Sequence, residues 1–131
     1  MDETEGIIQY KKYLSQSQLI TSLELDIIGK IIATMSYSKV KVNGYPDLGK
    51  YMMAYHIVRE ADLLAAYDID RCVMYSMYRD NSEYSDALQV AKSLFETRIL
   101  KMRKDRLFIT PYSKKESLKL QKKAKIDIES L

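Results

Sequence analysis

The spacing of apolar residues constrains the fold of this chain more than any other feature of its sequence. From Ile7 to Ile128, apolar side chains recur three and four positions apart far more often than two positions apart. This spacing places them on one side of an α-helix, whereas a half-buried strand would require strict alternation. The clearest sets are Ile28, Ile31, Ile32 and Met35, then Leu88, Ala91, Phe95, Ile99 and Met102. The pattern predicts an all-α protein with at least five helices.

Capping and turn residues predict where these helices begin and end. The segment from Thr21 to Glu24 has the pattern of a capping box, and Thr110 followed by Pro111 is a cap with proline at the first helical position. Asn43, Gly44 and Pro46 predict a loop over residues 36–50, and a short extended segment is expected at 107–110. The expected helices cover about 2–14, 22–35, 51–67, 69–79, 83–104 and 111–129.

The length of the chain favours a single domain that covers residues 1–131, because a chain of this length can bury a core without disulfides or metals. The only cysteine, Cys72, cannot form an internal disulfide, so we expect a reducing compartment and a small buried side chain. No apolar run is long enough for a secretory signal or a membrane span. We therefore expect a cytoplasmic protein that does not enter the membrane.

The charges are distributed unevenly along the chain. Residues 1–97 carry 10 basic and 14 acidic side chains, whereas residues 98–131 carry 11 basic and 4 acidic ones. A basic end of this kind attracts phosphate-bearing partners or acidic proteins, although a solvated lysine-rich helix is the more frequent explanation. The sequence thus leaves two interpretations of the basic helical end at about 111–131.

The stretch from Tyr51 to Tyr78 holds Asp62 among apolar and small residues, together with the only histidine, His56. Its Val58, Arg59, Ala61 and Asp62, followed by two leucines, resemble the closing helices of the HD-domain phosphohydrolase superfamily. Three further segments look similar to members of that superfamily: Gly44 to Leu48, Asp68 to Arg71, and Leu94 with Phe95. The family also has an early histidine and an adjacent His-Asp pair, and this chain has neither.

The resemblance implies an HD-domain-like helical bundle, incomplete at its N-terminal side, with Asp62 as the late metal ligand. It implies a divalent metal, Mn, Mg or Fe, if any, and a phosphoester as substrate. One family ligand cannot hold a catalytic cation firmly, so we expect no independent phosphohydrolase activity. The chain would then be a truncated gene product, a degenerate copy, or one that self-associates or is completed by another subunit.

Each of these acidic or basic residues also has a structural interpretation. A salt bridge with Arg59 or another basic residue is favoured for Asp62. His56 and Glu60, four residues apart, have a spacing that can bind a metal, but a hydrogen-bonded histidine is the favoured interpretation. Helix capping similarly accounts for Asp68 and Asp70 without a nucleotide–metal contact. The function that competes with the HD-like scaffold is a helical interaction module whose basic end binds nucleic acid or an acidic protein.

Overall fold

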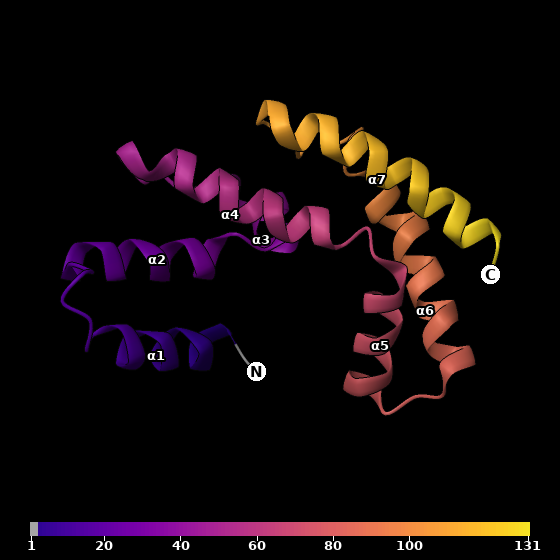
Figure 1. The fold of residues 1–131 in the computed structure, drawn as a ribbon, viewed down its shortest axis with the longest axis horizontal. Coiled ribbons are helices and arrows are strands. Elements are labelled where there is room, and N and C mark those ends of the chain that lie inside the picture. The colour runs from indigo at the N-terminus through magenta and orange to yellow at the C-terminus, as the bar shows by residue number, and fades with distance from the viewer. Residues whose placement is uncertain (1–2) are drawn as a thin grey trace. The chain divides into compact units, whose positions relative to one another are not determined.

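A computed structural model describes residues 3–131 as helices joined by turns, with no strand in that range (Figure 1). The predicted all-α class is therefore confirmed. The chain divides into two compact units, residues 1–59 and 60–131, and the boundary lies inside helix α4 (Met52–Ala65). No helix in residues 3–131 combines the length and the apolar composition needed to cross a membrane.

The first unit begins with two helices that lie side by side, α1 (Glu3–Leu14) and α2 (Ser22–Thr34) (Figure 1). The predicted capping box is present: the Glu24 amide donates to the Thr21 hydroxyl, and the Thr21 amide donates to the Glu24 carboxylate. The Tyr10 hydroxyl joins the two helices by donating to the Leu25 carbonyl at 2.7 Å. A glycine at position 29 leaves room for this hydroxyl, because a Cβ there would lie 2.9 Å from it.

The prediction of a continuous loop over residues 36–50 is wrong. A short helix, α3 (Tyr37–Asn43), forms within it and ends at Gly44, whose positive φ of 72° terminates the helix. None of the residues of α3 is buried. The apolar periodicity that reveals a packed helix was consequently absent from the sequence.

The core of the first unit forms around the start of α4. A 3₁₀ turn, η1 (Gly49–Tyr51), leads directly into this helix, which begins at Met52, one residue after the predicted start at about 51. Ile31, Leu48 and Tyr55 are buried together, and the Tyr55 side chain is fully inaccessible to solvent.

The second unit contains the end of α4, the helices α5 (Ile69–Asp80) and α6 (Tyr84–Thr97), the 3₁₀ turn η2 (Ile99–Lys101) and α7 (Pro111–Glu129). Helices α5 and α6 pack side by side (Figure 1). Their buried residues include Val73, Ala87, Ala91 and Phe95. The helix predicted for 83–104 is shorter than expected, because Arg98 leaves helical geometry at φ −134° and the chain turns through η2.

The last helix matches its prediction. Thr110 caps α7 by accepting a hydrogen bond from the Ser113 amide, and Pro111 occupies the first helical position. Ser113, Ser117 and Ala124 are buried, and their spacing of four and seven defines the packed side of the helix. The opposite side faces solvent and carries most of the lysines.

Candidate functional site

Asp62 lies on the exposed side of α4, at the edge of a pocket of about 230 Å³ in the second unit. The pocket has an apolar wall that includes Leu63, Leu94 and Met102. Arg71 and Arg98 line it together with the Asp62 carboxylate. Two guanidinium groups in one pocket attract an anion more strongly than a divalent cation, because their combined charge exceeds that of a single carboxylate.

The side chains within residues 3–131 do not form a metal centre. Among residues 3–131 there is no group of three or more histidine, cysteine, aspartate or glutamate side chains that could hold a metal ion. The metal-ligand role of Asp62 therefore stays a prediction that rests on the resemblance. Arg59, the first residue expected to pair with Asp62, lies over the Tyr45 ring at 4.9 Å and has a nitrogen 3.1 Å from His56 Nδ1, and its salt bridge with Asp62 stays a prediction.

His56 and Glu60 lie on one helix, and each makes contacts with residues outside that helix. The His56 ring contacts the rings of Tyr45 and Tyr55 edge to face, with centroids 4.8 and 5.2 Å away. The Glu60 carboxylate is buried and accepts hydrogen bonds from the Ile109 amide at 2.6 Å and the Thr110 hydroxyl at 2.6 Å. The contact of His56 Nδ1 with Arg59 and the hydrogen bonds of Glu60 agree with the favoured structural interpretation of the two side chains.

Glu60 is held as a carboxylate by these contacts. Burial alone raises its pKa, but hydrogen bonds from the Ser113 and Thr110 side chains and from the Ile109 and Thr110 amides outweigh burial and lower the pKa below its usual value. The charge of Glu60 is thus used to join the end of α4 to the start of α7 within the second unit. Sequence reasoning missed this role because the partners are about fifty positions away.

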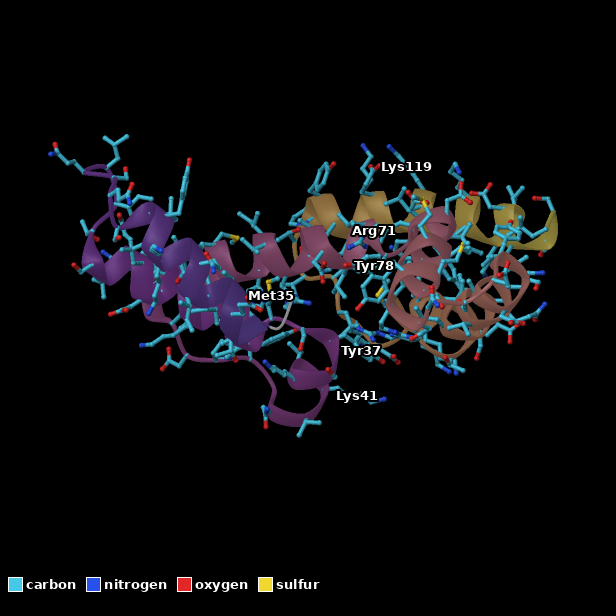
Figure 2. The ribbon with its side chains drawn as sticks, turned by 90° about the horizontal axis from the view of Figure 1, so that it is seen from below. Met35, Tyr37, Lys41, Arg71, Tyr78 and Lys119 are labelled. Carbon is cyan, nitrogen blue, oxygen red and sulfur yellow. The ribbon has the colours of Figure 1, made fainter. Side chains whose placement is uncertain are left out.

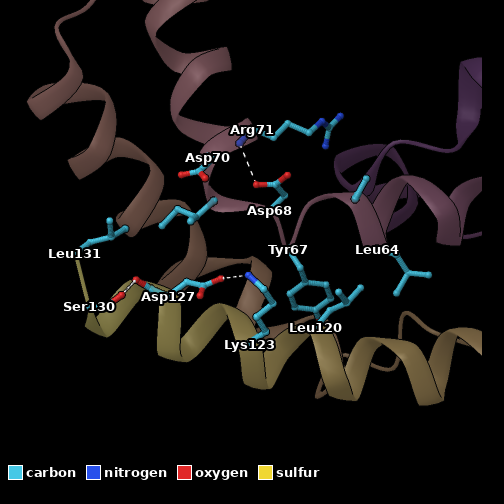
Figure 3. Close-up of a pocket in the computed structure, with 12 residues that line it drawn as sticks. Leu64, Tyr67, Asp68, Asp70, Arg71, Leu120, Lys123, Asp127, Ser130 and Leu131 are labelled. Carbon is cyan, nitrogen blue, oxygen red and sulfur yellow. Dashed lines mark hydrogen bonds and ion pairs between the residues drawn. The ribbon is translucent and has the colours of Figure 1, made fainter.

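Asp68 and Asp70 lie at the start of α5 and line a groove of about 660 Å³. Residues of α7 line the opposite side of this groove (Figure 3). Asp68 caps α5 by accepting a hydrogen bond from the Arg71 amide, as predicted. On the far side Lys123 pairs with Asp127 at 2.5 Å. The pKa of Lys123 is raised chiefly by Asp127, with smaller contributions from Asp68 and Asp70. The charge of Lys123 is therefore compensated inside the groove.

Cys72 is half-buried, with its Sγ 3.7 Å from the Ala66 carbonyl oxygen. Burial raises the pKa of its thiol. A thiol of this kind is a weak nucleophile, so the expected structural role of Cys72 fits its surroundings.

The solvent side of α7 is a basic surface, which we call the outer face. Lys119 projects away from the helix (Figure 2) and lies 3.4 Å from Glu116. Lys115, Lys122 and Lys125 are exposed and have no acidic partner among residues 3–131. Three large apolar or aromatic side chains are exposed among these lysines: Tyr112, Leu118 and Ile126. The outer face therefore combines uncompensated positive charge with exposed apolar groups.

A second basic feature follows η2, and we call it the basic pocket. Its volume is about 430 Å³, and it is lined by Arg103, Arg106, Phe108, Ile109 and Lys114. Sequence reasoning recognised the positive charge of this region but not the pocket. The cause is the missed end of α6, since the pocket forms only where the chain turns back between α6 and α7.

Comparison with known proteins adds no identity to this geometry: no protein-family model, no curated protein and no solved structure matches the chain.

Proposed function

We propose that this chain is a helical module that binds single-stranded nucleic acid through the outer face of α7. The observation that carries the proposal is the set of exposed lysines without acidic partners: Lys115, Lys122 and Lys125. Lysine ammonium groups bind phosphate diesters as point charges, and the counterions released from the nucleic acid drive association.

The exposed Tyr112 ring favours nucleic acid over an acidic protein as the partner. The ring lies on the same outer face as the lysines and is 71% exposed. Every base has a flat face that stacks on such a ring, and this contact is worth about 1–3 kcal/mol per base. An acidic protein would gain little from the ring, because its carboxylates are satisfied by the lysines alone.

The test is fluorescence anisotropy with a labelled single-stranded oligonucleotide, measured over about 50 to 200 mM salt. Replacing Lys115, Lys122 and Lys125 by glutamine should weaken binding and reduce the salt slope by about 2, since each lysine contributes about 0.7 for single strands. The matched control replaces three exposed lysines of the first unit, Lys12, Lys30 and Lys41. This control should leave the salt slope unchanged.

Two outcomes would refute the proposal. Oligonucleotide binding that is absent even at low salt removes it altogether. Equal binding of polyglutamate, together with no effect of Tyr112→Ala on oligonucleotide binding, assigns the outer face to an acidic protein. Lys123→Gln gives an internal check, because Asp127 already compensates that lysine and its loss should matter little.

A second proposal is an HD-domain-like scaffold that lacks independent phosphohydrolase activity. It is supported by the resemblance around Asp62 and by the pocket that this residue lines together with Arg71 and Arg98. The described residues do not supply a ligand set for a catalytic metal. The scaffold proposal therefore assigns no reaction to this chain, and an activity assay tests it.

A further inference from the structure

The basic pocket has the size and chemistry of a ligand site separate from the outer face. Its volume of about 430 Å³ falls within the range of small-molecule sites, about 300–1,000 Å³. Three of its five lining residues are cationic, and none is acidic. The other two, Phe108 and Ile109, give it an apolar wall. Such a lining suits a ligand with a doubly charged end and an apolar body.

The position of Arg103 is fixed before any ligand arrives. Its Nη1 donates to the Lys114 carbonyl at 2.5 Å and to the Ser117 hydroxyl at 2.6 Å, and this hydroxyl is buried in the side of α7 that packs inward. These contacts use one nitrogen of the guanidinium. The hydrogen bonds described for Arg103 leave Nε and Nη2 unused, and we expect these two groups to donate to an anion in the pocket. A guanidinium that is already ordered loses less side-chain entropy on binding.

Arg106 occupies a position where glycine is normally favoured. The Leu107 amide donates to the Met102 carbonyl and the Arg106 amide to the Arg103 carbonyl, the two bonds that define a Schellman turn at the end of a helical segment. Its left-handed residue is Arg106, with φ 57°. This conformation is unfavourable for a residue with a side chain, because its Cβ lies too close to the following carbonyl oxygen. The turn brings Arg106 into the same pocket as Arg103, which gives the unfavourable residue a function.

The apolar wall limits what the ligand can be. Phe108 is buried, and its ring stacks on Tyr67. The apolar surface that a ligand can contact therefore belongs chiefly to Ile109, which is 41% exposed. A phosphate monoester carries nearly two negative charges, whereas a diester within a strand carries one. Three cations around one pocket therefore favour the monoester over the diester.

We infer that the basic pocket binds the terminal phosphate of a nucleotide, with its base or sugar against Ile109. This inference deepens the proposed function. Where the nucleotide is the end of a nucleic-acid strand, the inference rests on that function. The same chemistry is present in a free nucleoside monophosphate, so the experiment must separate the two sources.

The test compares one oligonucleotide sequence with a terminal phosphate at either end and with none. We expect the phosphorylated strand to bind about tenfold more tightly, because its second negative charge adds a charge-assisted hydrogen bond. Arg106→Asn should abolish this preference while leaving binding of the unphosphorylated strand unchanged, because asparagine tolerates the left-handed conformation. Lys104→Gln is the matched control, since this exposed lysine of the same turn does not line the pocket.

The second arm titrates adenosine monophosphate and inorganic phosphate, with NMR chemical shifts as the readout. Shifts at Arg106, Ile109 and Lys114 with the nucleotide, but weaker ones with phosphate, support the inference. Equal affinity for phosphorylated and unphosphorylated strands, without nucleotide shifts at the pocket, overturns it and leaves the outer-face proposal standing. Nucleotide shifts at the pocket without oligonucleotide binding overturn the outer-face proposal instead.

Discussion

At the scale of single residues, Glu60 shows how a charged side chain becomes structural. Its carboxylate accepts hydrogen bonds from both the backbone and the side chain of the segment that starts α7. Glu60→Gln replaces one acceptor oxygen by a donor that faces the same N–H groups, so we predict a loss of about 2 kcal/mol in the free energy of unfolding. Chemical denaturation measures this loss. Glu116→Gln, at a surface pair, is the control and should change stability by less than about 0.5 kcal/mol.

The same contacts predict how stability depends on pH. Because the pKa of Glu60 in the folded protein lies below its ordinary value of 4.5, the ionised carboxylate stabilises the fold above that value. This contribution is lost as the pH falls through the lowered pKa. Denaturation midpoints should therefore drop more steeply below about pH 4.5 in the wild type than in Glu60→Gln. If the denaturation midpoints of the two proteins fall in parallel with pH, a carboxylate other than Glu60 determines the acid sensitivity of the fold.

Asp62 gives the contrasting case of an exposed acid with a predicted function. Asp62→Ala should change the free energy of unfolding by less than about 0.5 kcal/mol, because the side chain lies at the surface. With Mn²⁺, Mg²⁺ or Fe²⁺ added, we expect the purified wild type and the variant to hydrolyse phosphoesters no faster than buffer. Turnover in the wild type that disappears in Asp62→Ala would instead establish a metal site at this residue.

Some residue roles were not accessible from the sequence. The capping roles of Thr21, Asp68 and Thr110 were predictable, because a cap acts on amides within three positions. The role of Glu60 depends on a partner far along the chain. Arg106 was hidden for a different reason: sequence rules expect glycine where the chain takes a left-handed turn.

At the scale of elements, the contact between α1 and α2 depends on the close approach at Gly29. Alanine is about 1 kcal/mol better than glycine inside a helix, but here its Cβ would lie 2.9 Å from the Tyr10 hydroxyl. We predict that Gly29→Ala stabilises the protein by about 1 kcal/mol in a Tyr10→Phe background and by clearly less in the wild type. A double-mutant cycle from thermal unfolding measures the difference. Identical effects in both backgrounds would show that the helices readjust freely.

The predictability of each helix followed from how much of it is buried. Helices α2 and α7 have an inward-packed side and clear caps, and their ranges were predicted nearly residue by residue. Helix α3 buries nothing and was missed. The overextended prediction for α6 had a related cause: Ile99 and Met102 are buried at helical spacing, but they belong to a turn that follows the helix. Periodicity reports burial, and it does not report where the backbone leaves the helix.

At the scale of the whole molecule, the structure shows where the basic residues of the C-terminal part lie. Of the 11 basic residues in 98–131, eight lie on the outer face, in the basic pocket or in the compensated groove around Lys123. The sequence predicts only the total positive charge of this part, because the pairing of each basic side chain depends on which acidic side chains lie near it in space. This division makes the net charge of +3 a poor guide to binding.

The remaining prediction concerns self-association. Helix α5 exposes Met74, Tyr75 and Tyr78 on one side, with Tyr78 89% exposed. Adjacent exposed groups of this size form the kind of patch that monomers rarely leave uncovered. We predict that the apparent mass in light scattering rises with protein concentration. Tyr78→Lys adds charge to the patch and should shift the protein toward the monomer.

The control for this experiment is Tyr13→Lys, since Tyr13 is 78% exposed but lies on α1. It changes charge and aromatic content equally without touching the α5 patch. If both variants reduce the apparent mass to the same extent, association follows from net charge and not from this surface. A constant monomer mass for the wild type at every concentration would show that the α5 patch does not associate.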